Sequence, residues 1–170
     1  MKILIVSQYF WPENFRINDL AEELSKKNHQ VTVLTGIPNY PHGKYFQSYG
    51  LNSIGLQKFK KINIFRVPIV PRFSGKSFFL ILNYFCYAFF ASIFSIIFLI
   101  NKKFDVIFFY EPSPITVGIP AILFKKIKKI PIVFWVQDLW PETLSAVKFS
   151  KSKIISYTIG LLVRWTYKNC

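Results

Sequence analysis

The chain has 170 residues, enough for one domain with a buried core and too few for two domains of the usual size. Its formal charge of +14, with 52% hydrophobic and 19% aromatic residues, suits an anionic partner such as phospholipid headgroups, nucleic acid or a phosphorylated substrate. A compositional bias toward Lys, Ile, Phe and Asn would raise the same numbers. Because the basic residues form no recognition helix and do not alternate with exposed aromatic residues, we expect no nucleic acid among the partners.

The two cysteines, Cys86 and Cys170, have no metal-ligand spacing and no evident pairing. A reduced, cytosolic setting fits them best. At the start of the chain, only four apolar residues follow Met1 and Lys2, which is too few for the core of a signal peptide. We therefore expect a cytosolic chain without a metal site.

The first 35 residues follow a strand, helix, strand pattern. Residues 3–6 form a short apolar run with β-branched side chains, typical of a strand buried on both faces. Residues 15–27 have the period of an amphipathic helix, with apolar positions at Ile17, Leu20, Ala21 and Leu24. A second strand is expected at 31–34. Since βαβ crossovers are right-handed, the two strands should be parallel neighbours in one sheet.

The alternation of strands and helices continues along the chain. The segment 36–55 has no period and is rich in Gly, Pro, Asn and Tyr, which predicts a long and functional loop. Further strands are expected at 62–67, 106–109 and 131–136, with helices at 115–126, where Pro120 kinks or shortens the helix, and at about 151–167. The pattern predicts an α/β fold, a Rossmann-like doubly wound parallel sheet in one domain over residues 1–170.

No charged side chain occurs between Ser77 and Asn101. A helix over residues 78–100 would extend about 34 Å, which is enough to cross a bilayer. Three arrangements fit: a transmembrane helix, a helix buried against the sheet, or a helix packed on the sheet with its excess apolar face in a membrane surface. Because the strands before and after it read as one sheet, and because aromatic residues occur all round it, we favour the third.

This interpretation places the protein on the cytoplasmic face of the inner membrane as a peripheral or monotopic protein. The long apolar surface helix would carry the membrane contacts, with basic residues at its ends meeting anionic headgroups. The expected membrane-contacting residues are Phe78, Phe79, Phe85, Phe89, Phe90, Phe94, Lys76, Lys102 and Lys103.

Ligands of open parallel sheets bind beyond the carboxyl ends of the strands, so the segments that follow the strands are the candidate sites. The first such segment carries Glu13 and Asn14 at the start of a helix, where free N–H groups favour a phosphate, although Asn14 would equally serve as a helix cap. The second carries Asn39, Tyr40 and His42, and a solvated loop is the simpler explanation for this histidine.

Carboxylates follow the two later strands. Glu111 comes directly after the strand at 106–109, and Asp138 and Glu142 follow the strand at 131–136. A pair of carboxylates four residues apart at the mouth of a strand is suited to general-base work or to binding hydroxyl groups. Asp138 as a turn cap and Glu142 in a first helical turn are the structural alternatives. No Walker lysine loop, glycine-rich dinucleotide fingerprint or metal-ligand cluster occurs, so we expect no cofactor bound by this domain alone.

Three segments together resemble one family: residues 1–13 (MKILIVSQYFWPE), 31–41 (VTVLTGIPNYP) and 135–142 (WVQDLWPE). They are similar to the N-terminal domain of retaining GT-B glycosyltransferases of family 4, of the kind that builds bacterial O-antigen, capsule or colanic-acid polysaccharides. The resemblance covers nearly the whole chain, and the order of the PNYP and DLWPE segments is fairly specific.

The resemblance implies two Rossmann-like domains, the first binding an acceptor on a polyprenyl diphosphate at the inner membrane face, the second binding a nucleotide sugar. It implies no metal requirement. Together with the positions after the strands, this leads us to expect acceptor binding by Glu13, Asn14, Asn39, Tyr40, His42 and Glu111, and catalysis by Asp138 and Glu142.

The chain departs from the family in two respects. Many relatives have glycines in the first strand-to-helix loop, near the donor phosphate, whereas this chain has 13–16 (ENFR), so we expect Arg16 to bind phosphate instead. The sequence also ends at Cys170, before the expected donor-binding domain. We therefore expect an acceptor-side domain that is inactive alone, from a truncated reading frame or a split subunit. The alternative is a non-catalytic remnant that docks to a membrane or a partner.

Overall fold

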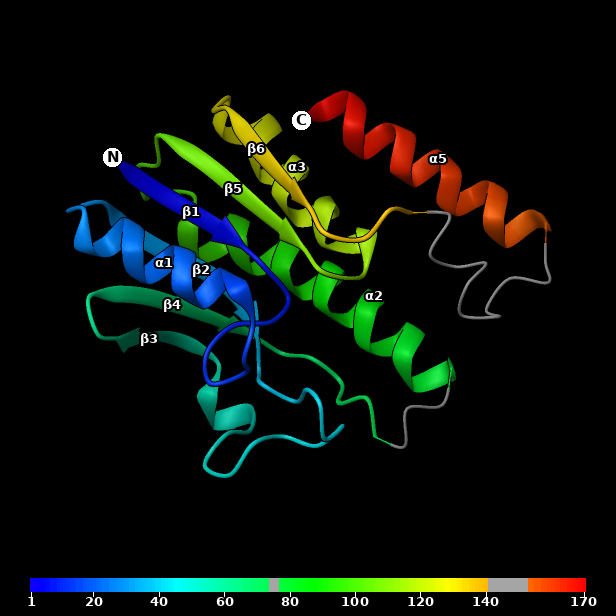
Figure 1. Cartoon of the computed structure of the whole chain (residues 1–170), viewed down its shortest axis with the longest axis horizontal. Coiled ribbons are helices and arrows are strands. Elements are labelled where there is room, and N and C mark those ends of the chain that lie inside the picture. Colours follow the sequence, from blue (N-terminus) through cyan, green and yellow to red (C-terminus); the bar gives the residue numbers. More distant parts are fainter. Residues whose placement is uncertain (74–76, 141–152) are drawn as a thin grey trace.

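A six-stranded sheet organises the chain (Figure 1). The computed structural model describes residues 1–73, 77–140 and 153–170. Along the sheet the strands are β3 (Gly55–Phe59), β4 (Ile62–Val67), β2 (Gln30–Gly36), β1 (Lys2–Val6), β5 (Val106–Glu111) and β6 (Ile132–Val136). Neighbouring strands are parallel except β3 and β4. This confirms the predicted α/β, Rossmann-like class, with one antiparallel strand added at an edge.

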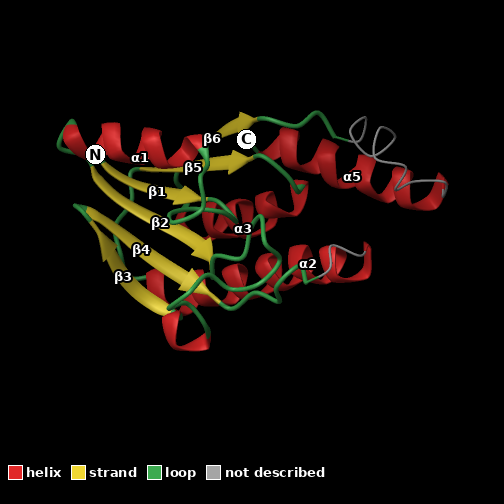
Figure 2. Cartoon of the chain, turned by 60° about the horizontal axis from the view of Figure 1, so that its bottom comes forward, coloured by secondary structure: helices red, strands yellow, loops and turns green. Residues whose placement is uncertain are grey.

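Helices cover both faces of the sheet. They are α1 (Arg16–Lys26), α2 (Ser77–Phe94), α3 (Gly118–Lys128) and α5 (Lys153–Asn169). Figure 2 shows α1 on one side of the sheet and α2 on the other. Ile17 and Ala21 of α1 pack with Ile3 and Ile5 of β1, whereas Leu4 and Val6 pack toward α2 and α3. Alternate side chains of β1 therefore belong to two separate hydrophobic cores, one on each face of the sheet, as expected of a strand buried on both faces.

Sequence patterns predicted every described element longer than three residues except β3. This strand exposes Leu56 and Lys58 and has no continuous apolar run, so its pattern is that of a half-exposed edge strand. Pro120 is the third residue of α3, in the first turn, where its missing N–H needs no partner. A 3-10 turn at Ile115–Val117 precedes it, and the α-helix is accordingly shorter than the predicted 115–126 at its start.

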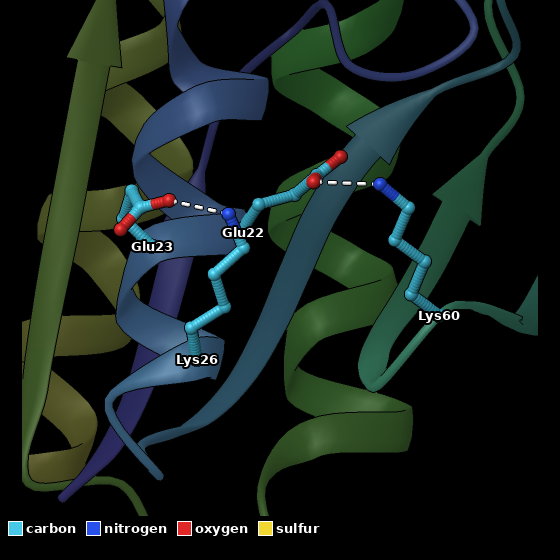
Figure 3. Close-up of polar contacts among 4 residues, drawn as sticks. All are labelled: Glu22, Glu23, Lys26 and Lys60. Atoms are coloured by element: carbon cyan, nitrogen blue, oxygen red, sulfur yellow. Dashed lines mark hydrogen bonds and ion pairs between the residues drawn. The ribbon is translucent and has the colours of Figure 1, made fainter.

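Residues of α1 form two surface ion pairs, one within the helix and one with the turn between β3 and β4 (Figure 3). Lys60, in the turn between β3 and β4, contacts the carboxylate of Glu22 at 2.6 Å, and Lys26 contacts Glu23 at 2.6 Å within the helix. Exposed pairs of this kind contribute at most about 1 kcal/mol each. The first pair nonetheless links the edge hairpin, which the sequence did not predict, to α1.

The long apolar helix packs with a small and polar side toward the core. Its buried residues are Asn83, Tyr87, Ala88 and Ala91, and a π-helical turn at Ser95–Leu99 continues it with Ser95 and Leu99 buried. Large apolar side chains face outward instead: Phe78 is 69% exposed, Phe85 60% and Phe89 60%. In the described part of the chain, the stretch Ser77–Leu99 is long and apolar enough to cross a membrane, judged by length and composition alone.

The strands on either side of α2 belong to one sheet. β1 pairs with β2, which precedes α2 in the chain, and with β5, which follows it. A spanning α2 would have to separate these paired strands, because it would place them on opposite sides of the bilayer.

Candidate functional site at the carboxyl edge of the sheet

The predicted catalytic, acceptor-binding and phosphate-binding residues that the structure describes lie at or after the carboxyl ends of β1, β2, β5 and β6. From β1 the chain adds β2 and β4 on one side of β1 in the sheet, and it then returns to add β5 and β6 on the other side. This is the topological switch point, where open α/β sheets place their ligands.

Glu13 joins the loop after β1 to the loop after β2. Its side chain is 1% exposed, and its Oε1 accepts the backbone N–H groups of Asn39 and Tyr40, both at 2.8 Å. Its Oε2 accepts the N–H of Phe10 at 3.3 Å. These contacts hold the PNYP segment against the first loop. Glu13 therefore acts through the loops it positions, since its carboxylate is enclosed by backbone groups.

Burial raises the pKa of Glu13 to about 7, against the lowering effect of those N–H groups and of the Arg66 charge. Arg66 is itself 1% exposed, and its guanidinium donates to Gln57 Oε1 at 2.9 Å and to the carbonyl oxygens of Gly36 and Trp11. Buried charges need such partners. The Glu13 carboxylate and the Arg66 guanidinium, both buried, thus hold together the loops at the carboxyl edge of the sheet.

An amide network connects the same loops to α2. Asn83 Nδ2 donates to Val70 O at 2.6 Å and to Asn39 Oδ1 at 3.3 Å, and its Oδ1 accepts Gln8 Nε2 at 2.7 Å. Asn83 is completely buried. Sequence reasoning missed this residue, although a lone amide inside an uncharged apolar run was an available signal. Asn39 is buried as well, so it too positions the loops.

Three tyrosine rings surround Arg72, which sequence reasoning placed among the basic residues at the ends of the apolar run and not in the site. The guanidinium carbon lies 5.2 Å from the ring centre of Tyr40, 5.5 Å from that of Tyr84 and 5.8 Å from that of Tyr9. Its Nη2 donates to the Tyr84 hydroxyl at 2.7 Å. Among the described residues, no carboxylate forms an ion pair with this half-buried cation. An arginine held among aromatic faces keeps its charge available to an anion.

Aromatic stacking fixes this cage. Tyr9 lies against Phe15 with ring centres 4.9 Å apart and planes 8° from parallel, and Tyr40 contacts both rings at 5.6 and 5.3 Å. Burial raises the pKa of Tyr9 well above its usual value, and the Arg72 charge opposes that shift. Tyr9 therefore stays neutral, and the positive charge of Arg72 is not cancelled.

Asp138, Glu111 and Arg16 gather on the other side of β1. Their charges all act on the pKa of Tyr110, which burial raises: Arg16 lowers it, and Asp138 and Glu111 raise it. Arg16 is exposed at the first turn of α1, and Asp138 is half-buried after β6. The structure thus brings a predicted phosphate-binding residue and a predicted catalytic residue to the same part of the edge.

Glu111 is fully buried, and burial together with the nearby Asp138 charge raises its pKa to about 9. The Trp140 indole N–H and the Asp138 backbone N–H lower this pKa, but less than burial raises it, and neither makes a hydrogen bond of good geometry to the carboxyl oxygens. Burial also raises the pKa of Asp138. At neutral pH Glu111 is protonated, which leaves Asp138 as the accessible carboxylate of this pair.

The remaining predicted residues lie at the rim. Asn14 is exposed and does not cap α1, whose N-cap is Phe15 with no side-chain cap, so the capping interpretation is wrong. His42 is exposed, with its ring centre 6.1 Å from that of Phe46. Glu142 lies outside the described residues. Within 1–73, 77–140 and 153–170, no three His, Cys, Asp or Glu residues gather as metal ligands.

The residues predicted to touch a membrane divide into two groups. Phe78, Phe85 and Phe89 are exposed on α2, whereas Phe90 and Phe94 pack partly against the core and Phe79 is half-buried. Lys102 and Lys103 follow the end of the helix, where Lys103 is exposed and Lys102 is half-buried, whereas Lys76 precedes the helix in the sequence and lies outside the described residues.

Comparison with known proteins identifies the family. A search of the curated proteins finds no match. The model of the family described as Glycosyltransferase Family 4 matches residues 15–170 and so includes α1, the PNYP loop, α2 and both edges of the sheet. Members of such a family transfer a glycosyl group from a nucleotide sugar to an acceptor. The chain therefore belongs to Glycosyltransferase Family 4, and its α/β sheet agrees with one Rossmann-like half of a GT-B transferase.

Proposed function

We propose that this domain forms the acceptor side of a retaining glycosyltransferase that adds a sugar to a lipid-linked saccharide during synthesis of a cell-surface polysaccharide of the O-antigen or capsule kind. The observation that carries the proposal is the position of Arg72. Its tyrosine cage lies at the switch-point edge, a few residues before α2, whose outer face is apolar and exposed. A cation beside an apolar face matches a diphosphate joined to a polyprenyl chain.

The acceptor sugar would extend from Arg72 toward Asp138. In this arrangement the exposed Tyr40, His42 and Asn14 border the acceptor, and Asp138 accepts a hydrogen bond from the hydroxyl group that receives the new sugar. Glu142, four residues later in the same DLWPE segment, would assist it. Glu13, Asn39 and Glu111 support this surface from the interior, because all three are buried.

The donor would be held mainly by a donor-binding domain distinct from residues 1–170. Arg16, exposed at the start of α1, is suited to contact the donor diphosphate together with the helix N-terminus. The sequence contains neither a glycine-rich phosphate loop nor the acidic donor motif. We therefore propose that residues 1–170 are inactive by themselves and complete an active site with a donor-binding domain.

Membrane attachment would follow from α2. Since β1 pairs with strands that precede and follow α2, we propose that the helix lies in the cytoplasmic surface of the membrane and does not cross it. Protease treatment of inverted vesicles tests this: every fragment should be digested, and a protected fragment around 78–100 would contradict it.

A transfer assay tests the enzymatic proposal. Residues 1–170 are mixed with labelled nucleotide sugar and a polyprenyl-diphosphate-linked acceptor, with and without a donor-binding domain of the same family. We expect labelled product only with the added domain, and loss of most product in Asp138→Asn, while Asp19→Asn on the exposed side of α1 serves as the matched control. Product from residues 1–170 alone would contradict the proposal that transfer needs a separate donor-binding domain. Absence of product with every donor domain would favour the non-catalytic docking protein.

A further inference from the structure

A basic cavity lies at the amino edge of the sheet, opposite the candidate active site. Its volume is about 280 Å³, and it is lined by polar residues from three strands and from the loop after α2: Lys2, Gln30, Thr32, Asn63, Lys102 and Lys103. Sites for drug-sized ligands usually measure about 300–1,000 Å³, so this cavity fits a small polar group.

Strand register places the polar floor of this cavity on the α2 face of the sheet. Lys2 pairs with Gln30, and Thr32 pairs with Asn63. Side chains two positions apart on a strand share a face, and Leu4 and Leu34, two positions further along, belong to the core beneath α2. Polar residues thus replace the apolar core just where α2 ends and no longer covers the strands.

The cavity carries an excess of positive charge. Three of its lining residues are lysines, and the ion pairs found among the described residues, Lys26 with Glu23 and Lys60 with Glu22, involve none of them. One carboxylate is close: Asp105 Oδ2 accepts the backbone N–H of Lys2 at 2.6 Å. Lysine ammonium groups with amide and hydroxyl neighbours are the usual partners of a phosphate.

The exposed apolar face of α2 ends beside this cavity. Ile96, Ile97 and Phe98 are 39%, 60% and 51% exposed in the last turns, and the N–H of Lys102 donates to Leu99 O at 3.0 Å. The end of the helix is fixed further by Lys128, whose Nζ donates to Ile100 O at 2.7 Å. A ligand seated here would have its charged group in the cavity and its apolar part along α2.

We propose that this cavity binds the phosphate headgroup of an anionic phospholipid and thereby anchors the second end of α2 in the membrane surface. The ligand is a bulk lipid rather than the acceptor, because Arg72 and Asp138 lie at the opposite edge of the sheet. The site rests on the proposed membrane attachment but not on glycosyl transfer. With its acyl chains over Ile97 and Phe98, the lipid would hold the helix parallel to the bilayer.

Vesicle flotation tests the proposal without any sugar substrate. The chain is mixed with phosphatidylcholine vesicles with and without phosphatidylglycerol, and three variants are compared. Lys102→Gln with Lys103→Gln removes two cavity charges. Lys58→Gln with Lys61→Gln removes the same charge from the exposed β3 and β4 hairpin. Thr32→Val with Asn63→Leu replaces two polar groups of the lining with apolar ones and leaves the net charge unchanged.

We expect the first and third variants to lose at least about tenfold in partition to phosphatidylglycerol vesicles, and the hairpin variant to lose much less. Circular dichroism and the thermal midpoint check that each variant is folded, and if Thr32→Val with Asn63→Leu does not fold, the comparison of the two lysine pairs decides. Equal losses for the two lysine pairs, or equal binding of the parent chain to both vesicles, would overturn the site. Because the assay contains no donor or acceptor, failure of the transferase proposal leaves its result unaffected.

Discussion

The backbone N–H of Asn39 donates to Glu13 Oε1 at 2.8 Å, so a carboxylate from the loop after β1 fixes the loop after β2. The two residues are 26 positions apart and lie in two of the segments, 1–13 and 31–41, by which the sequence resembles the family. This contact explains how a WPE segment and a PNYP segment form one surface.

Removing the Glu13 carboxylate should destabilise the fold. Glu13→Ala leaves the N–H groups of Asn39 and Tyr40 without a partner, and we expect a loss of about 2–4 kcal/mol in the free energy of unfolding. Glu13→Gln keeps an accepting oxygen and should lose less. Urea denaturation followed by circular dichroism measures both, with the exposed Glu23→Gln as control. Equal stability of Glu13→Ala and the parent would show that the carboxylate does not hold the loops.

Glu111 should make the fold less stable as pH rises above neutral. Its pKa of about 9 in the folded chain lies above the 4.5 of an exposed Glu, so folding takes up a proton, and this contribution is complete below pH 4.5 and is lost as pH rises through 9. From pH 7 to 9 the loss due to Glu111 should be about 2 kcal/mol, and Glu13, whose pKa is about 7, adds a smaller loss as it finishes ionising.

The measurement is the free energy of unfolding in urea at pH 7 and pH 9. Glu111→Gln, which cannot ionise, should show a much smaller fall than the parent, and Glu23→Gln should behave like the parent. An unchanged fall in Glu111→Gln would mean that the buried carboxyl does not retain its proton.

Substitutions on the buried side of α2 should lower the stability of the fold, whereas substitutions on its exposed side should lower binding to membranes. Asn83→Leu breaks the bonds to Gln8, Asn39 and Val70 inside the fold, and we expect it to lose about 2–3 kcal/mol of stability although it makes the helix more apolar. Phe85→Ser with Phe89→Ser changes only exposed side chains and should alter stability by less than about 1 kcal/mol.

Vesicle flotation then supplies the complementary readout. The Phe85 and Phe89 variant should bind vesicles more weakly than the parent, because it removes apolar area from the surface. If that variant unfolds in urea much earlier and binds vesicles normally, α2 is a core helix and the proposed membrane contact is wrong.

Arg72 should determine affinity for the acceptor diphosphate. Arg72→Lys keeps the charge but loses the planar group that stacks among Tyr9, Tyr40 and Tyr84, and Arg72→Ala loses both. With a short-chain prenyl-diphosphate sugar, we expect binding to weaken at least about tenfold in Arg72→Ala and less in Arg72→Lys. Calorimetric titration measures this, with the exposed Arg164→Ala on α5 as control. A folded Arg72→Ala with unchanged affinity would exclude the diphosphate contact.

Much of the fold was predictable because buried parallel strands and amphipathic helices have distinct periods. Residues 3–6 have the pattern of a buried strand and residues 17–24 that of an amphipathic helix. The structure confirms both, as β1 and α1. The edge strand β3 was not predictable, since its stability comes from pairing with β4 and not from its own apolar residues. Its burial pattern alternates only between half-buried and exposed residues.

The site was predictable by position but not by role. Sequence order placed Glu13, Asn39 and Glu111 after strands, at the correct edge, but depth within that edge depends on how loops fold over one another. Asn83 was missed, and Arg72 was expected only at lipid headgroups, for the same reason: their contacts in the site come from neighbours far apart in the chain.

The central claim is that this domain receives a lipid-linked sugar at the carboxyl edge of its sheet while α2 rests on the same membrane. The most direct measurement is the affinity of residues 1–170 for bilayer discs of one phospholipid composition, with and without a polyprenyl-diphosphate-linked sugar. We predict at least about tenfold tighter binding to discs that carry the acceptor, and loss of that difference in Arg72→Ala and in Asp138→Asn. Equal affinity of the parent chain for both discs would contradict the claim.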